Sequence, residues 1–178
     1  REMTLFFAPQ VNSYKRFGPD TLAPWLIDWG LDNRSAMLRI PPERGPGARM
    51  EVRLGDATAN PYLIMAAVGA AVYVGVRDKV EPPAPLEGYG YDPESAPMLP
   101  QTLGAALDAL EADTVLADAI GPYFVTSFVT YKRNEIERFE RFERLWWVRW
   151  VVELGVVRLF RLRFLTRPWR PRRPLRPL

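Results

Sequence analysis

Cysteine and histidine are both absent from the 178 residues, and lysine is scarce, at 3 Lys against 21 Arg. Without cysteine the chain forms no disulfide and has no thiol nucleophile, and without histidine it cannot build a Ser-His-Asp triad. The two absences together also exclude a Cys/His zinc site within the chain. A metal ion held here would therefore need carboxylate ligands or ligands from outside the chain.

The positive charge is concentrated at the end of the chain. Residues 1–144 hold 12 Arg and 3 Lys against 20 acids, a net charge of −5, whereas residues 145–178 hold 9 Arg and one acid, a net charge of +8. Composition changes at the same point, to Leu, Val, Trp, Arg and Pro. We therefore divide the chain into a body, residues 1–144, and a divergent tail, residues 145–178. The acidic body argues against a nucleic-acid-binding protein.

The N-terminal sequence does not have the pattern of a signal peptide. The N-terminal sequence REMTLFFAPQ has no initiator Met and lacks the cationic-then-apolar order of a signal peptide, so we expect a fragment of a longer, cytoplasmic protein. Three hypotheses stay open for the tail. It is an out-of-frame reading of a GC-rich gene, a membrane-surface segment rich in Trp and Arg, or an RNA-binding segment with stacking aromatics.

Strands and helices are indicated by local pattern. SAMLRIP and RMEVRLGD predict strands joined by the loop PERGPGA, and APWLIDWG predicts another strand. The uncharged run from Ala57 to Val76 contains Asn60-Pro61, an N-cap followed by a first-turn proline, so we expect a buried central helix and no transmembrane segment. A proline-rich surface excursion, EPPAPLEGYGYDPESAPMLPQ, follows. Thr102 and Thr114 predict helix caps, and GPYFVTSFVTYKRNEIERFERF predicts a long C-terminal helix.

Five arginines and only three acids occupy residues 33–56. In a regular strand, Arg49, Glu51 and Arg53 share one face, and the flanking guanidiniums keep Glu51 ionised as a ligand for a hard cation. Arg34 and Arg39 are five residues apart, so both meet one ligand only if Arg34 precedes the strand or a bulge intervenes. The pattern indicates a polyphosphate and carboxylate site. The alternative is a solvated sheet face with Arg–Glu pairs, and Arg44 either folds over the site or stays in water.

Three ordered motifs, NSYKRFGP, NRSAMLRIP and RMEVRLGDATANPYL, together with the Ala-rich segment after them, resemble the C-terminal part of the glutamine synthetase catalytic domain. The resemblance covers residues 12–76 and continues through the helices to about Phe142. Its closest likeness is to the actinobacterial synthetase-like branch. It implies an α+β fold, part of a curved antiparallel sheet with packed helices. It also implies a homo-oligomer in which ATP phosphorylates the side-chain carboxylate of glutamate and ammonia or an amine displaces the phosphate.

The resemblance also implies roles for individual residues. Arg34 and Arg39 match catalytic residues on the ATP phosphates and the transferring phosphoryl group, and Arg49 matches a third ATP-binding arginine. Glu51 matches a ligand of the Mg²⁺ or Mn²⁺ ion beside the γ-phosphate. Substrate glutamate is implied to contact Arg16 and Arg53.

One departure from the family concerns the acceptor. Many ammonia-using members carry a flap glutamate that binds ammonium, and Leu22 stands at that position, with Asp20 and Asp28 as nearby acids. We therefore expect a preference for an organic amine such as a polyamine or ethanolamine, with ammonia as the alternative. The family's other metal ligands would lie upstream of this chain. An inactive remnant or an assembly protein with a basic interaction tail is the alternative outside the enzyme class.

Overall fold

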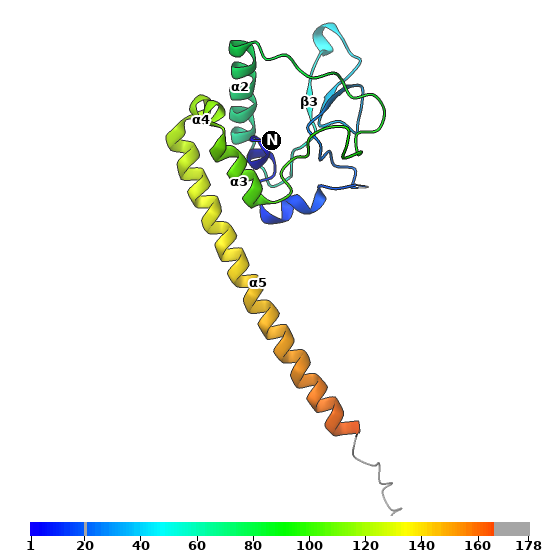
Figure 1. Cartoon of the computed structure of the whole chain (residues 1–178), viewed down its shortest axis with the longest axis vertical. Helices are drawn as coiled ribbons and strands as arrows, with labels where there is room; N and C mark the ends of the chain where they lie inside the picture. The colour runs from blue at the N-terminus through cyan, green and yellow to red at the C-terminus, as the bar shows by residue number, and fades with distance from the viewer. Residues whose placement is uncertain (20, 166–178) are drawn as a thin grey trace, which may run out of the picture. The chain divides into compact units, whose positions relative to one another are not determined.

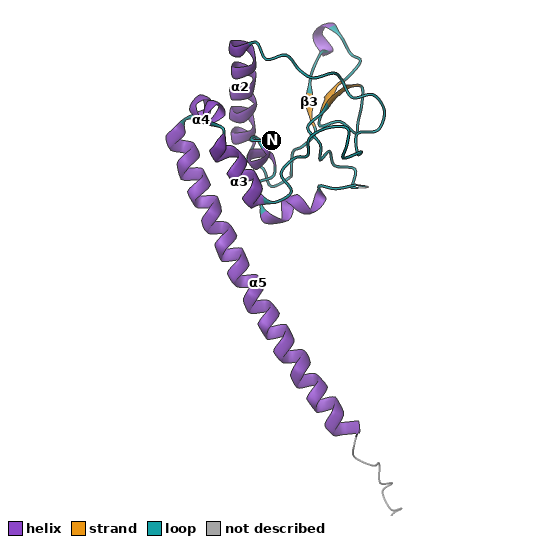
Figure 2. Cartoon of the chain, in the orientation of Figure 1, coloured by secondary structure: helices purple, strands orange, loops and turns teal. Residues whose placement is uncertain are grey.

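The computed structural model describes residues 1–19 and 21–165, and it divides into two units, Arg1–Ile136 and the unit that begins at Glu137. The boundary expected at residue 144 stays a prediction, and Asp20 and residues 166–178 lie outside the described residues. Helices account for more of the first unit than strands do, and its strands are short (Figures 1 and 2). This mixture is the expected α+β class.

The sheet has three strands in the order β1 (Trp29–Leu31), β2 (Leu38–Ile40) and β3 (Glu51–Val52). β2 and β3 pair antiparallel, as expected, but β1 and β2 pair in parallel, so the sheet is mixed. Parallel neighbours normally need a long crossover. Here six residues suffice, because each strand is three residues long and the return loop is fastened to Asp28, whose carboxylate accepts the Met37 N–H at 2.6 Å.

The helical core lies around the first residues of the chain. The short helix α1 (Thr4–Phe7) is fully buried and packs against α3 (Leu103–Ala112). Leu103, Leu107 and Leu110 recur on one face of α3 at helical spacing and are buried. Phe6 stacks on Phe128 of helix α5 (Pro122–Leu165) at a centroid distance of 5.6 Å. After α1 the chain forms a 3-10 helix, η1 (Val11–Arg16), and the loop before β3 holds another, η2 (Gly45–Gly47).

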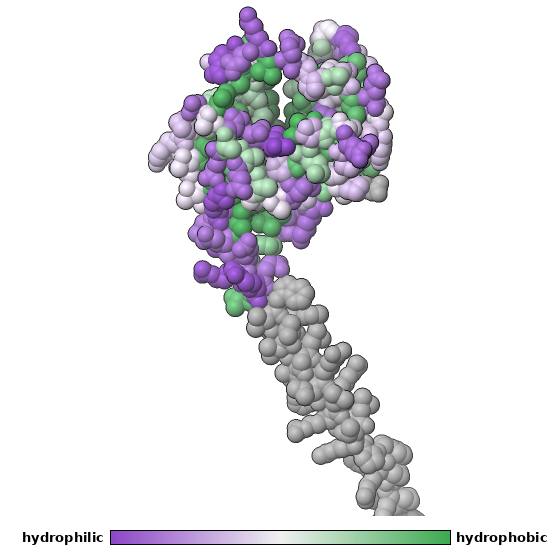
Figure 3. All heavy atoms as spheres, viewed as in Figure 1, coloured by the Kyte–Doolittle hydropathy of each residue, from purple (hydrophilic) through white to green (hydrophobic). Residues whose placement is uncertain are grey.

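Helix α2 (Pro61–Asp78) begins as predicted, since the Asn60 side chain accepts the Tyr62 N–H at 2.9 Å and Pro61 occupies the first turn. The expectation of a buried central helix is wrong for α2. Only Ala67 and Ala70 are buried, whereas large apolar residues on its outer side are exposed, Met65 by 71%. Figure 3 shows apolar surface over this helix. No helix among the described residues is long and apolar enough to cross a membrane.

The last three helices follow one another closely. Thr102 caps α3 as predicted, accepting the Ala105 N–H at 3.1 Å. The predicted cap of α4 (Thr114–Ile120) is wrong by one residue: Asp113 caps it by accepting the Leu116 N–H at 2.9 Å, so Thr114 already lies inside the helix. Helix α5 (Pro122–Leu165) confirms the predicted C-terminal helix and continues into residues 145–165 of the tail.

Candidate active site

The β2–β3 pairing sorts the arginine-rich segment onto two faces. Arg39 stands directly opposite Glu51, and Leu38 stands opposite Val52. Because successive side chains of a strand point to opposite faces, the charged pair occupies one face and the apolar pair the other. The register therefore places a guanidinium from β2 beside the carboxylate of β3.

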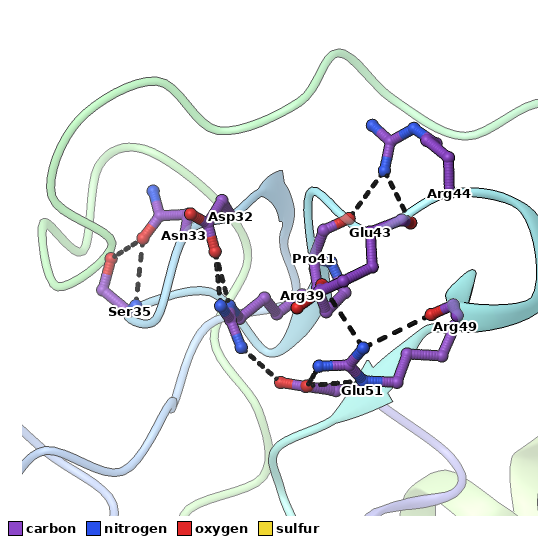
Figure 4. Close-up of polar contacts among 10 residues, drawn as sticks. Asp32, Asn33, Ser35, Arg39, Pro41, Glu43, Arg44, Arg49 and Glu51 are labelled. Carbon is purple, nitrogen blue, oxygen red and sulfur yellow. Dashed lines mark hydrogen bonds and ion pairs between the residues drawn. The ribbon is translucent and has the colours of Figure 1, made fainter.

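Glu51 lies between two guanidiniums (Figure 4). Arg39 donates to its Oε2 at 2.8 Å, and Arg49 donates to its Oε1 at 3.1 Å. Hydrogen bonding from Arg39, and to a lesser degree from Arg49, lowers the pKa of Glu51, so the carboxylate is ionised at neutral pH. The predicted ionised state is confirmed, but its principal partner is Arg39 on the neighbouring strand rather than Arg53.

Arg39 also binds a second carboxylate, that of Asp32 at the end of β1. Its Nε donates to Asp32 Oδ1 at 3.1 Å, and its terminal nitrogen contacts the same oxygen. The Arg39 side chain is 13% exposed, so it is the more buried partner in both ion pairs. Sequence reasoning did not single out Asp32, because the ion pair depends on the parallel β1–β2 pairing.

Arg34 lies before β2, which is one of the two arrangements that would let Arg34 and Arg39 meet one ligand. It is exposed and has no hydrogen bond or ion pair with any residue that the structure describes. Two hollows meet at Arg34. One, of about 540 Å³, is also lined by Asp32 and Arg39. The other, of about 510 Å³, is also lined by Arg53 and Leu22.

Arg53 does not join the Glu51 network. Its guanidinium lies 3.5 Å from the Ala36 carbonyl oxygen and lines the second hollow. The regular strand ends at Val52, so the strict alternation expected for residues 49–53 does not extend to Arg53. Arginines of residues 33–56 thus line two neighbouring hollows instead of sharing one face of a strand.

The remaining two arginines lie away from both hollows. Arg16 donates to the carbonyl oxygens of Leu54 and Gly55, the latter at 3.1 Å, and so supports the turn that follows Arg53. Arg44 folds back on its own loop and donates to the Pro41 carbonyl oxygen at 2.7 Å. Arg44 therefore does not cover the site, and the glutamate-binding role expected for Arg16 stays a prediction.

The second hollow also contains residues that sequence reasoning missed. Tyr89 and Tyr91, from the proline-rich excursion, line it together with Leu22, Arg34 and Arg53. The available signal was the alternating sequence Gly88-Tyr89-Gly90-Tyr91, which indicates a tight turn but not its location.

A divalent metal site is incomplete in these residues. Glu51 is one carboxylate, and no group of three Asp, Glu, His or Cys residues among the described positions is arranged to hold a metal ion. Mg²⁺ and Mn²⁺ take several oxygen ligands. Glu51 can contribute one of them, and the described residues do not by themselves fit a complete Mg²⁺ or Mn²⁺ site.

Comparison with known proteins gives consistent matches. The family model for the glutamine synthetase catalytic domain matches residues 1–151. The glutamine synthetase of Pyrococcus abyssi is 42% identical over 146 residues, 78% of this chain and 33% of that enzyme. That of Thermus thermophilus is 42% identical over 134 residues, 71% of this chain and 30% of that enzyme. The chain thus spans about a third of the length of these relatives.

Solved structures agree with the sequence matches. GmaS without ligand superposes with a TM-score of 0.68 at 38% identity, over 79% of this chain and 32% of that chain. A GmaS complex with ADP gives a TM-score of 0.69 at 36% identity, over 79% and 34% of the two chains. The fold and the sequence therefore point to the same relatives.

Proposed function

The chain belongs to the glutamine synthetase family, and we propose that it supplies part of the active site of an ATP-dependent ligase that joins ammonia or an amine to the γ-carboxylate of glutamate. The observation that carries this proposal is the position of Arg34. Its guanidinium has no anionic partner among the described residues and stands where the two hollows meet. A site that brings the phosphates of ATP next to the carboxylate of glutamate needs a cation between the two anions, and Arg34 lies where the two hollows meet.

The two hollows suit the two halves of the reaction. In the first, Arg34 and Arg39 face the polyphosphate of ATP, with Arg49 behind them on Glu51. In the second, Arg34 and Arg53 face the substrate glutamate and its γ-glutamyl phosphate. Phosphoryl transfer depends mainly on positioning and charge neutralisation. Arg34 can neutralise the charge of the phosphoryl group both while it is on ATP and after it has moved to glutamate.

Other residues act by holding this arrangement. Asp32 and Glu51 fix the Arg39 guanidinium from two sides, so it is preorganised for the phosphates. Arg16 fixes the turn after Arg53 through the carbonyl oxygens of Leu54 and Gly55. A metal ion in such a ligase would neutralise phosphate charge, and Glu51 would be its one ligand from the described residues.

An organic amine is the second candidate for the acceptor. Leu22 lines the second hollow and is 78% exposed, and a leucine neither attracts ammonium nor takes its proton. The substitution Leu22→Glu would supply the missing carboxylate. It should raise kcat/KM for ammonium if ammonia is a poor acceptor for lack of a carboxylate at this position.

The test of the proposed function uses a fusion of this chain to the upstream two thirds of Pyrococcus abyssi glutamine synthetase, because the chain spans 33% of that enzyme. The assay is hydroxylamine trapping, which converts an acyl phosphate to a hydroxamate and reports glutamate activation whatever the natural acceptor is. We expect hydroxamate that requires both ATP and glutamate. Arg34→Ala should lower its rate at least about 100-fold, the scale of losing one preorganised charge contact.

The matched control is Arg44→Ala, which removes an exposed arginine from the same segment that touches only its own loop. It should retain the activity of the fusion. Equal losses in the two variants, or hydroxamate formation that does not need ATP, would show that the site has been assigned wrongly.

A further inference from the structure

Part of the proline-rich excursion is hydrogen-bonded along β1. The Trp29 indole Nε1 donates to the Pro83 carbonyl oxygen at 2.7 Å, and the Leu86 N–H donates to the Trp29 carbonyl oxygen at the same distance. One residue of β1 therefore holds two positions of the excursion through its side chain and its backbone. We call residues 83–90, the stretch that begins with these contacts, the strap.

The strap continues onto the turn that follows β1, at residues 33–35. Asn33 Nδ2 donates to the Gly88 carbonyl oxygen, and the Gly90 N–H donates to Ser35 Oγ, each at 2.8 Å. Within the turn, Asn33 Oδ1 accepts the Ser35 N–H at 3.0 Å and the Ser35 hydroxyl at 2.7 Å (Figure 4). These two side chains therefore close the turn on itself and join it to the strap.

Two glycines allow the turn, the strap and β1 to approach this closely. A Cβ atom at Gly90 would lie 2.7 Å from Leu86 Cδ2 and 2.9 Å from Ser35 Oγ. A Cβ atom at Gly30 of β1 would lie 2.8 Å from Asn33 Cβ. Since neither position has room for a side chain, the turn is fixed by packing as well as by hydrogen bonds.

Arg34 is the middle residue of this turn, and its side chain has no restraint of its own. Two carboxylates hold the guanidinium of Arg39, whereas the guanidinium of Arg34 makes no hydrogen bond or ion pair with any residue that the structure describes. A long side chain gives up rotamer freedom when it binds a ligand. The place from which Arg34 reaches the two hollows is therefore set by the backbone that Asn33 and Ser35 fix.

We infer that Asn33 and Ser35 are positioning residues of the ligase, which tie the turn carrying Arg34 to the strap and so place its guanidinium for phosphoryl transfer. The inference rests on the proposed function, because Arg34 must contact the phosphoryl group. Catalysis by fixed charges depends on their placement, and a displacement of about 1 Å costs about 100-fold in rate.

The contacts of the two side chains favour positioning over direct binding of a substrate. Asn33 and Ser35 both reach the wall of the second hollow. Their polar atoms are nevertheless engaged with each other and with the strap, since Asn33 Oδ1 accepts two hydrogen bonds and Asn33 Nδ2 donates one. The Ser35 hydroxyl likewise donates one hydrogen bond and accepts another.

The test is a double-mutant cycle in the fusion protein, with hydroxamate formation as the assay. Ser35→Ala should lower kcat about tenfold, less than Arg34→Ala does, because the guanidinium is still present but is placed less well. The loss should fall on kcat rather than on KM for ATP, since the contact matters most in the transition state. In the Arg34→Ala background, Ser35→Ala should lower kcat by less than about twofold, because no guanidinium is left to place. Equal losses in both backgrounds would assign Ser35 to the fold or to a substrate and overturn the inference.

A second variant disturbs the same contact from the side of the strap. Gly90→Ala places a Cβ atom against Ser35 Oγ without changing any residue of the turn, and it should show the same dependence on Arg34. The matched control is Ser95→Ala, which removes an exposed serine hydroxyl from the same excursion. That hydroxyl donates only to the Asp92 carbonyl oxygen, at 2.7 Å, so the control should retain the rate of the fusion.

Thermal unfolding and the unsubstituted fusion separate the ways in which the proposals fail. If neither Ser35→Ala nor Gly90→Ala is folded at the assay temperature, the contacts serve the fold and the positioning role is wrong. If the unsubstituted fusion forms no hydroxamate, the proposed function fails and the positioning role fails with it. If hydroxamate formation falls in Arg34→Ala but not in Ser35→Ala or Gly90→Ala, the proposed function stands and only the positioning role is overturned.

Discussion

Removing the carboxylate of Asp28 should destabilise the first unit through one hydrogen bond. Asp28 is 7% exposed, and its Oδ1 accepts the Met37 N–H at 2.6 Å at the entrance to β2. In Asp28→Ala this partly buried N–H loses its partner, which costs about 1–3 kcal/mol. For a chain of this size, about 2 kcal/mol corresponds to a fall in Tm of about 4–8 °C.

Asp28→Asn separates the hydrogen bond from the charge. The amide oxygen can still accept the Met37 N–H, and the variant removes an ionised group from a buried site. Burial raises the pKa of Asp28, partly opposed by the Met37 N–H. The Asp28 carboxyl therefore stays protonated in the folded chain at pH values where it is already ionised in the unfolded chain. As pH rises through the raised folded pKa, ionisation of Asp28 lowers the stability of the fold.

Thermal unfolding of the 178-residue chain, followed by circular dichroism at pH 7, checks both variants. We expect Asp28→Asn to unfold close to wild type and Asp28→Ala to unfold at lower temperature. Asp118→Ala is the control, since that exposed carboxylate makes no hydrogen bond or ion pair with any described residue. A fall in Asp28→Asn as large as in Asp28→Ala, or none in either, would refute the role given to the Met37 hydrogen bond.

Three further predictions concern the charge network, the tail and the isolated chain. Arg39 lowers the pKa of Glu51 in the folded chain. The ionised carboxylate therefore stabilises the fold above the unfolded pKa of Glu51, and this stabilisation is lost as pH falls through the folded pKa. The Tm difference between wild type and Glu51→Gln should accordingly shrink from pH 7 to pH 3. Deletion of residues 145–178 should leave the Tm of the body unchanged, and a drop of more than about 5 °C would show that the tail contributes to its stability. The 178-residue chain alone should show no release of phosphate from ATP that requires glutamate and an amine, because Glu51 by itself cannot hold the divalent ions. A colorimetric phosphate assay with the purified chain tests this.

Local chemistry was predictable from the sequence, and long-range pairing was not. The start of α2 followed from Asn60 and Pro61, which act on neighbouring backbone groups. The ionised state of Glu51 was also predicted, but Arg39 reaches it across the sheet, and that partner depends on strand register. The exposure of α2 was missed, since hydropathy reports what a residue favours and not what covers it. Tyr89 lies in the second hollow because its neighbours Gly88 and Gly90 are hydrogen-bonded to Asn33 and Ser35, each 55 positions away in the sequence, and no local pattern contains such contacts.

The turns at residues 33–35 and 88–90 are hydrogen-bonded to each other, and this has a consequence for how the hollow between them changes during evolution. Arg34 and Tyr89 are held by the same Asn33 and Ser35 side chains, so a substitution that shifts one turn also moves the other. Residues within one hydrogen-bond network show non-additive mutational effects. Substitutions at Tyr89 should therefore be epistatic with substitutions at Arg34. A lineage that remodels one turn would have to accommodate the change in the other turn as well.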